Sequence, residues 1–438
     1  MKKIYSILLI ALATLTIQAQ NTTYTTDRFV GGDISLLPSY EQYNTPYKTA
    51  SGATINNLVT YAANTLHWNS CRVRLFVNPV ITNADGTKQG EVQDLDYVIA
   101  LGKRIKQAGM AFMLDFHYSD TWADPVKQTI PRAWQSLSEQ DLYDTMYTYT
   151  KECLEALVAE GVTPDFVQIG NEISYGMLWR NNDDKAYPTS KFYQGTEDPA
   201  WTRFAGFLNQ GARAVREVCP DAKIIIHIER TAKWDYCTDY FRNIEHGNVD
   251  YDIIGLSYYP FWHGWMNGTE GSQLKTVIEA LHNYFPNRNI QIVETAYYNN
   301  YWPSDGISYD TRTKWPASAA GQKAYLDDLV TFLADYDYVN GLYYWFPEEN
   351  GCGGPTWNAS TIVITNWINR GLFDPNSHKA LAGLNSLGAF LPSTPLGIET
   401  VQTRQDGIYY SVTGTPLGTD YDLLPAGLYI FNGAKILK

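Results

Sequence analysis

The sequence predicts an α/β fold, a (β/α)8 TIM barrel with a short C-terminal β-rich tail, on three observations. Short apolar runs recur along the chain, helical patterns separate them, and polar residues gather where the runs end. Most of the runs are apolar on both faces, as parallel strands covered by helices are. Strands that alternate with helices in this way close into a barrel. We place the barrel at residues 20–392 and its strands at 29–35, 70–76, 111–118, 166–172, 223–228, 253–259, 290–297 and 341–346.

Helical periodicity fills the segments between several of these runs. Residues 92–109 carry apolar side chains on one face and end at Gly109, a residue suited to a helix C-terminus. Ser138 is placed to cap the helix that follows the third run. Further helical patterns cover 201–218, 272–285 and 322–336. An open doubly wound sheet is the alternative, but its usual G-x-G-x-x-G turn is missing after the first run.

The two ends of the chain differ from the barrel in composition. Residues 1–19 read as a signal peptide, with Lys2 and Lys3 ahead of an apolar stretch and small residues before a cut after Ala19. We therefore expect an exported protein, periplasmic or extracellular. No other apolar run reaches the roughly 20 residues of a membrane span. Residues 393–438 read as a linker followed by a small β-rich tail with a hairpin pattern.

Charge and cysteine usage exclude several classes of partner. The formal net charge is −13 and no Lys/Arg-rich run occurs, which argues against nucleic-acid binding. The five cysteines are widely spaced without a CxxC pair, so a zinc site is poorly supported. Cys71 and Cys153 fit buried free thiols better. We expect a monomer that requires no cofactor.

Polar side chains recur at the C-terminal ends of the predicted strands, where barrel enzymes carry their active sites. Core strands normally exclude such groups, because burying them unpaired is costly. Their repetition at one end of successive strands therefore predicts a site. The residues in question are Asp33, Arg74, Asp115, His117, Asn171, Glu172, Tyr258, Tyr259, Glu294 and Trp345.

Two glutamates stand out among these residues. Glycoside cleavage uses one carboxylic acid to protonate the leaving oxygen and one carboxylate at the anomeric carbon. Glu172 and Glu294 end the fourth and seventh strands, and a separation of about 5–5.5 Å between them would predict retention of configuration. Asn171 suits a hydrogen bond to the sugar 2-hydroxyl, and Tyr258 is placed to steady Glu294. The alternative is that either glutamate is a structural ion-pair partner.

The stretch DFHYSDTWADP, residues 115–125, allows a metal site or the floor of a sugar-binding cleft. His/Asp clusters at barrel mouths do hold catalytic metals. However, the fifth strand ends with a single histidine, His227, and the other ends offer amide, hydroxyl and aromatic groups. We therefore favour a sugar site around Asp115 and His117, with no metal.

Tryptophans follow most of the predicted strands, which suggests stacking surfaces for sugar rings. The alternative is that these rings fill a large core. The first reading predicts a long open cleft with several subsites. The tryptophans concerned are Trp122, Trp134, Trp179, Trp234, Trp262, Trp265, Trp302, Trp315 and Trp357.

Several motifs resemble glycoside hydrolase family 53, the arabinogalactan endo-β-1,4-galactanases, over roughly residues 28–390. They are GGDISLLPSYE, RVRLFVNP, DFHYSDTWADPVKQTIPRAW, QIGNEISYGMLW, IGLSYYPFWHG and VETAYY. The resemblance implies a barrel of the retaining clan that acts on the β-1,4-galactan side branches of pectin. It implies Glu172 as acid/base and Glu294 as nucleophile. For the cleaved galactose it implies Arg74, His117, Asn171, Tyr258 and Trp345, and for neighbouring subsites Asp120, Trp122, Asp124, Trp262 and His263.

Two departures from the family pattern bear on the site. The strand-eight motif usually continues Trp-Glu-Pro, whereas here it is Trp345–Phe346–Pro347, with Glu348 and Glu349 displaced. A structural calcium ion in the loop after strand seven is left open, because residues 299–314 contain two aspartates but no regular run of oxygen ligands.

Two other functions stay open on the residues alone. A retaining hydrolase of the same clan that acts on mannan or xylan would use the same pair of glutamates. A non-catalytic glycan-binding surface protein would need neither glutamate, so their presence speaks against it.

Overall fold

The computed structural model describes residues 27–42, 46–79, 92–267, 273–351, 369–392, 408–411, 416–431 and 434–438. The predicted signal peptide and linker, together with Cys352 and Trp357, lie outside these residues. The described residues fall into two compact units that divide between Leu391 and Pro392.

Eight parallel strands of the first unit close into a barrel, so the predicted (β/α)8 fold is confirmed. Around the barrel the order is β1-β10-β9-β8-β7-β6-β5-β4. The strands are β1 (Phe29–Asp33), β4 (Ser70–Leu75), β5 (Ala111–Phe116), β6 (Phe166–Ile169), β7 (Lys223–Ile228), β8 (Ile253–Ser257), β9 (Asn289–Thr295) and β10 (Val339–Trp345). Most predicted strands extend a few residues too far at their C-terminal ends, because those polar residues belong to the loops of the barrel mouth.

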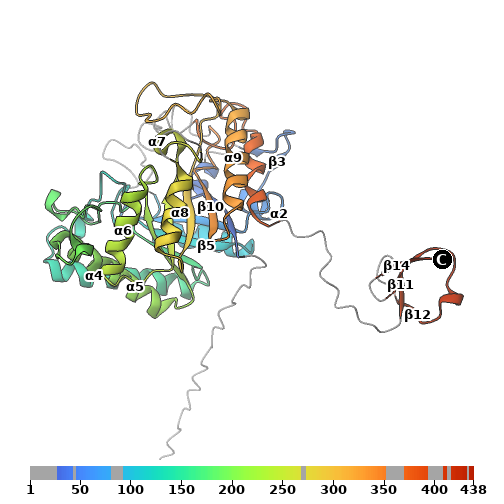
Figure 1. Ribbon diagram of the computed structural model, residues 1–438, viewed down its shortest axis with the longest axis horizontal. Coiled ribbons are helices and arrows are strands. Elements are labelled where there is room, and N and C mark those ends of the chain that lie inside the picture. The colour runs from blue at the N-terminus through green and yellow to red at the C-terminus, as the bar shows by residue number, and fades with distance from the viewer. Residues whose placement is uncertain are drawn as a thin grey trace, which may run out of the picture. The chain divides into compact units, whose positions relative to one another are not determined.

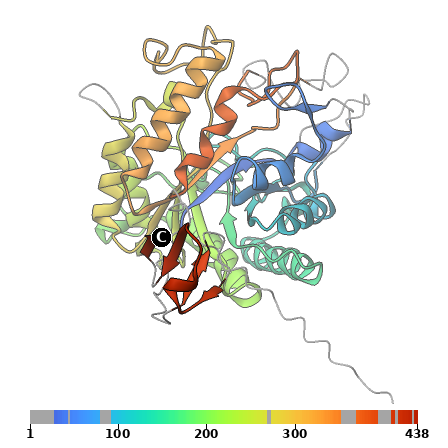
Figure 2. The ribbon, with the colours of Figure 1, turned by 90° about the vertical axis from the view of Figure 1, so that its right-hand side faces the viewer.

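Helices surround the strands on the outside of the barrel (Figures 1 and 2). They are α1 (Leu37–Glu41), α2 (Leu58–Asn64), α3 (Leu95–Gln107), α4 (Glu139–Ala159), α5 (Pro199–Val218), α6 (Trp234–His246), α7 (Pro260–His263), α8 (Leu274–Tyr284) and α9 (Ala319–Ala334). Ser138 caps α4 by accepting a hydrogen bond from the Asp141 N–H, as predicted. Gly109 follows α3 with φ +75°, the left-handed conformation that glycine adopts without strain.

The segment after β10 departs from the strict alternation of strand and helix. Within its described residues 369–392 it forms two short 3₁₀ helices, Ala382–Asn385 and Leu387–Phe390, and no α-helix. Glycine and asparagine are frequent here and weaken regular α-helix formation. No helical pattern was singled out in the sequence for α6, although its buried Cys237, Phe241 and Ile244 do recur at helical spacing.

The interior of the barrel is divided into an apolar and a polar layer. Ala111, Met113 and Ile225 belong to an apolar cluster near the N-terminal ends of the strands. Side chains two residues further along a strand point to the same face. Asp115 therefore follows Met113 into the interior, and His227 follows Ile225. The strand period thus places polar groups at the mouth, above an apolar floor.

A β-bulge in β9 turns Glu294 into this interior. Between β8 and β9 the pairing passes from Leu256↔Ile292 to Ser257↔Glu294, so β9 contains one extra residue. The pairing of β9 with β10 shows the same extra residue. Val293 belongs to the interior cluster, and without a bulge the next side chain would face outward. The bulge therefore re-aims Glu294 toward the barrel axis.

The second unit is a four-stranded antiparallel sheet with the order β12-β11-β13-β14. Its strands are β11 (Tyr409–Ser411), β12 (Pro416–Gly418), β13 (Leu428–Phe431) and β14 (Ala434–Leu437). The predicted β-rich tail is confirmed, with more strands than a single hairpin. A separate pair, β2 (Tyr47–Lys48) and β3 (Thr54–Ile55), forms a short hairpin in the loop after α1.

The chain leaves β10 through a turn that buries two glutamates. Phe346 has φ +67° and packs edge-on against Tyr40, so the position after Trp345 points away from the barrel mouth. Glu348 is fully buried, and its Oε1 accepts the Leu36 N–H at 2.9 Å. Burial, together with the charge of Asp33, raises the pKa of Glu348 to about 8.

This raised pKa predicts a pH-dependent stability that Glu348→Gln removes. An acid whose folded pKa lies above its unfolded value stabilises the fold below the unfolded pKa, and loses that contribution as pH rises through the folded pKa. The free energy of unfolding of E348Q minus that of the wild type should therefore be larger at pH 8.5 than at pH 5, by on the order of 3 kcal/mol. Urea unfolding at both pH values measures the difference. The exposed Glu155→Gln should show no such trend, and an equal trend in both variants would contradict the assignment.

Candidate active site

A cavity of about 470 Å³ opens at the C-terminal ends of the barrel strands. Both glutamates predicted from the sequence line it, although they are 122 residues apart in the chain. Of the residues singled out in the sequence, those that line the cavity are Arg74, His117, Trp122, Asp124, Asn171, Glu172, Trp262, His263, Glu294 and Trp345.

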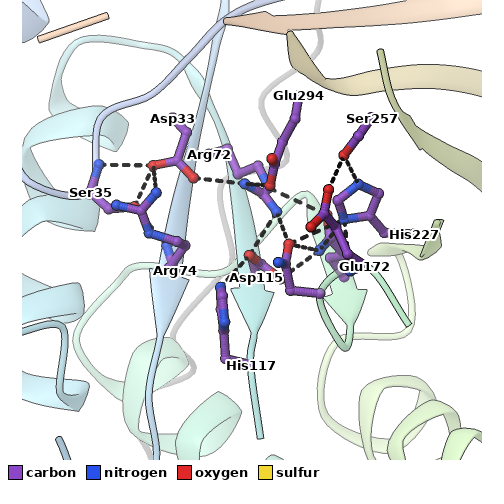
Figure 3. Close-up of polar contacts among 12 residues, drawn as sticks. Asp33, Ser35, Arg72, Arg74, Asp115, His117, Glu172, His227, Ser257 and Glu294 are labelled. Carbon is purple, nitrogen blue, oxygen red and sulfur yellow. Dashed lines mark hydrogen bonds and ion pairs between the residues drawn. The ribbon is translucent and has the colours of Figure 1, made fainter. Parts of the chain in front are cut away.

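Arg72 of β4 occupies the centre of the polar layer beneath this cavity and is fully buried (Figure 3). Its Nη1 lies 2.7 Å from Asp33 Oδ2 and 2.9 Å from Glu294 Oε1. Its Nη2 lies 2.7 Å from Asp115 Oδ2 and donates to Asn171 Oδ1 at 2.7 Å. Buried ions are tolerated when charge and hydrogen bonds compensate their lost hydration. Arg72 therefore fixes side chains from four other strands and their loops around one point.

Asp33 and Asp115 lie beneath the cavity and do not line it. Both are fully buried, and each pairs with Arg72. Burial alone would raise the pKa of Asp115, but the neighbouring guanidinium of Arg72 holds it below its ordinary value. The structure thus places these two predicted substrate contacts as supports of the residues above them.

Arg74 follows Arg72 by two residues, so it lies on the same face of β4 but closer to the mouth, and it lines the cavity. Its guanidinium stacks on Trp122, 4.4 Å from the ring centroid, and faces Trp345 at 5.9 Å. Asp33 Oδ1 lies 3.2 Å from its Nη1. Cation–π contact and one carboxylate therefore hold this arginine flat against the cavity wall.

Glu172 sits on a strained turn directly after β6. Its φ is +47°, which is uncommon for a residue with a side chain, and Gly170 two positions earlier has φ +86°. The turn presents the carboxyl group to the cavity, where Ser257 Oγ donates to Oε1 at 2.7 Å. Burial and the charge of Glu294 raise the pKa of Glu172 well above its ordinary value.

His227 of β7 orients this hydrogen bond. The Glu172 N–H donates to His227 Nδ1 at 3.3 Å, so the neutral ring carries its proton on Nε2. That nitrogen lies 2.8 Å from Ser257 Oγ, which in turn directs its own proton to Glu172. Burial and the charge of Arg72 keep the pKa of His227 well below its ordinary value, which preserves the neutral ring.

Glu294, near the end of β9, is held through both carboxylate oxygens. Arg72 contacts Oε1, and the Tyr259 hydroxyl donates to Oε2 at 2.9 Å. Burial raises the pKa of Glu294, while Arg72 and Tyr259 oppose that rise. The expectation that Tyr258 steadies Glu294 is wrong. Tyr258 is fully buried behind the cavity, and its hydroxyl donates to the Gly264 carbonyl at 2.9 Å.

His117 lines the cavity as a neutral ring. The Ala123 N–H donates to its Nδ1 at 3.0 Å, which leaves the proton on Nε2, 3.2 Å from Asp115 Oδ2. Burial lowers the pKa of His117, although Asp115 opposes this. The histidine is thus positioned by a backbone amide on one side and a buried carboxylate on the other.

Two further expectations need correction. Asp120 does not line the cavity; it accepts the backbone N–H groups of Asn78 and Arg132 at 3.0 and 2.9 Å and so orders the surrounding loops. Trp134 and Trp315 are buried in the core, as the core alternative for the tryptophans required. Among the described tryptophans, those that line the cavity are Trp122, Trp262 and Trp345.

Several site residues were not singled out from the sequence. They are Arg72, Gln168, Glu229, Arg230, Ser257 and Arg370. Arg72 had a signal, because it shares a strand face with Arg74 at a spacing of two. Arg370 had none, because it lies in an irregular segment after β10.

The loop after β9 gives no support for a calcium site. The Asp310 carboxylate is engaged by Arg312, with 2.8 Å between Oδ1 and Nε. Within the described ranges, no group of three or more His, Cys, Asp or Glu side chains could hold a metal ion.

Comparisons with known proteins agree with this geometry. The family model described as glycosyl hydrolase family 53 matches residues 29–387. A probable arabinogalactan endo-β-1,4-galactanase A of Aspergillus terreus is 32% identical over 82% of this chain and 94% of its own length. The arabinogalactan endo-β-1,4-galactanase of Cellvibrio japonicus is 31% identical, over 88% of this chain and 94% of its own.

A solved structure agrees as well. The Ignisphaera aggregans GH53 catalytic domain superposes with a TM-score of 0.71 at 29% identity, covering 84% of this chain and 97% of that one. The family model spans most of the chain and the barrel fold is shared, so the chain belongs to glycosyl hydrolase family 53 and is a glycoside hydrolase.

Proposed function

We propose that this hydrolase cleaves internal β-1,4-galactosidic bonds of pectic galactan and arabinogalactan with retention of configuration. The observation that carries the proposal is the pair of glutamates in one cavity with different surroundings. Glu172 has a pKa raised well above its ordinary range, as a general acid requires. Glu294 is held by a guanidinium and a hydroxyl, which favour its ionised form. The galactanase relatives supply the substrate class.

In the first step a Glu294 oxygen attacks the anomeric carbon while Glu172 gives its proton to the glycosidic oxygen. Ser257 donates to Glu172 Oε1, which leaves Oε2 to carry that proton. The carbon–oxygen bond to the leaving sugar breaks, and an ester forms between Glu294 and the remaining chain. In the second step Glu172 takes a proton from water, whose oxygen attacks the same carbon and releases Glu294. Two inversions restore the original configuration.

Export of the chain is part of the same proposal. Residues 1–19 have the composition of a signal peptide, and a polymeric substrate is met outside the cytoplasm. No helix of the described ranges is long and apolar enough to cross a membrane.

Replacement of either glutamate should separate the two roles. Glu294→Ala should abolish hydrolysis of galactan and of aryl galactosides, because no ester can form. Glu172→Ala should lose at least about 1,000-fold on galactan but keep much of the first step on a 2,4-dinitrophenyl galactoside, whose leaving group needs no proton. With azide, E172A should yield the β-galactosyl azide and E294A the α-anomer, as measured by NMR.

Glu349→Gln is the matched control, because Glu349 is buried but lies outside the cavity. Its galactan activity should match that of the wild type. Substantial activity in E294A or E172A on galactan would refute the assignment. Reducing-sugar assays on galactan, mannan, xylan and arabinan decide the substrate, and preference for mannan or xylan would support the alternative within the clan.

Tyr259→Phe tests the hydrogen bond on Glu294, with Tyr258→Phe as its matched neighbour. Without the Tyr259 hydroxyl the pKa of Glu294 should rise, so the acid limb of the kcat/KM profile should move to higher pH. We expect a loss of about 10- to 100-fold near the lower end of that profile, from the hydrogen bond to a charged group. Y258F should leave the profile unchanged. A shift of equal size in Y258F would show that the effect is structural.

A further inference from the structure

Arg370 is a buried arginine in the wall of the active-site cavity, in the segment after β10. It is 1% exposed. Its backbone is fixed, because the Arg370 carbonyl accepts hydrogen bonds from the Tyr344 hydroxyl at 2.6 Å and from Gln322 Nε2 at 3.3 Å. The side chain therefore starts from a defined point and ends in the cavity wall.

The guanidinium of Arg370 is enclosed by aromatic rings from α7 and the residue before it, from the loop after β9 and from the end of β10. Its central carbon lies 5.3–5.5 Å from the centroids of five rings. They belong to Tyr259, Phe261, Trp262, Tyr298 and Trp345. Such contacts offset part of the cost of taking a cation out of water. They do not supply the oxygen acceptors that a guanidinium needs.

Within the described ranges Arg370 has no such acceptor. Nε and Nη1 are buried without a hydrogen-bond partner, and no carboxylate oxygen lies within 4.0 Å. Arg230 and Arg74 also have guanidinium nitrogens without a hydrogen-bond partner, but each lies beside a carboxylate, that of Glu229 at 2.9 Å and that of Asp33 at 3.2 Å. Leaving a buried donor unpaired is costly. An arginine side chain held in a cavity wall without an acceptor is therefore best explained by an acceptor that arrives with a ligand.

The order of strands indicates which part of a substrate would meet the Arg370 guanidinium. Around the barrel, β10 lies next to β9, which carries Glu294. It lies opposite β6, which precedes Glu172. Tyr259, the hydrogen-bond donor to Glu294, is one of the five rings around Arg370. Under the proposed mechanism the leaving sugar departs on the side of Glu172. Arg370 therefore lies toward the part of the chain that stays bound to Glu294.

We propose that Arg370 is a specificity-determining residue. It donates from its guanidinium to hydroxyl oxygens of the galactose unit next to the cleaved one on its nonreducing side. The planar guanidinium holds its N–H groups in fixed directions toward the oxygens of that sugar, and the surrounding rings give the sugar a flat wall. The inference rests on the proposed function and assigns one of its subsites.

The test compares Arg370→Met and Arg370→Lys on substrates of different length. Methionine keeps an unbranched side chain among the rings but removes the charge and the donors; lysine keeps the charge but loses the planar guanidinium. R370M should lower kcat/KM on β-1,4-galactotetraose by about 10- to 100-fold. On 2,4-dinitrophenyl β-galactoside, whose single sugar occupies the cleaved position, it should change kcat/KM less than about 3-fold. R370K should fall between the wild type and R370M on the tetraose.

Arg312→Met is the control, because Arg312 is exposed, paired with Asp310 and outside the cavity. Both substrates should be hydrolysed as by the wild type. The thermal midpoint of R370M should equal or exceed that of the wild type, because a buried charge without a counter-ion is removed.

The outcomes separate the inference from the function it rests on. A wild type without activity on galactan would overturn the proposed function and this subsite with it. An active wild type whose R370M variant cleaves the tetraose equally well would overturn the subsite alone. Equal losses on both substrates together with a lower thermal midpoint would show that Arg370 only supports the aromatic rings, and would also overturn it.

Discussion

The structure of the barrel mouth depends on one buried cation. Arg72 contacts three carboxylates and two side-chain amides, and these groups are carried by four other strands or by the residues directly after them. Removing one partner from such a buried set typically costs about 3–5 kcal/mol, because the remaining charge is left uncompensated. The network therefore ties catalytic geometry to the stability of the fold: the side chains around Arg72 cannot shift separately without leaving a charge unpaired.

The charge balance around Arg72 also explains why the two glutamates differ. Three carboxylates surround the one guanidinium, so the centre of the mouth carries an excess of negative charge. Glu294 is inside this network and gains a direct positive partner. Glu172 lies outside it, feels the charge of Glu294 without a cation of its own, and receives only a hydroxyl and a neutral histidine. Two identical side chains are thus given different environments by their distance from one arginine, which suits the acid and nucleophile roles that we propose.

The rigid and the variable parts of the site come from different kinds of structure. Side chains that surround the glutamates are carried by strands or by residues directly after them, where the backbone is fixed by the barrel. Residues that would meet the rest of a polysaccharide lie outside the strands, Arg230 and Arg370 in loops and Trp262 in the short helix α7. Loops can change without disturbing the barrel, so this division lets the chemistry stay constant while the fit to the substrate varies.

The sequence by itself determined the barrel, the strands that carry polar ends and the two glutamates. It could do so because parallel strands covered by helices are apolar over their whole length, and the C-terminal ends of strands in a closed barrel all open at one mouth. The family motifs identified the same residues independently, and most of the predicted contacts do line the cavity.

Only the tertiary structure decided which of two similar residues, close together in the sequence, makes a given contact in the site. A period of two places Arg72 and Arg74 on one face but does not tell which lies at the centre of the polar layer. At the end of β8 the side-chain alternation stops, so Tyr259 and not Tyr258 reaches Glu294, and a bulge in β9 aims Glu294 itself. Arg370 lies in an irregular segment with no period at all. Such assignments depend on layer, bulge and loop path, and these are set by contacts between distant parts of the chain.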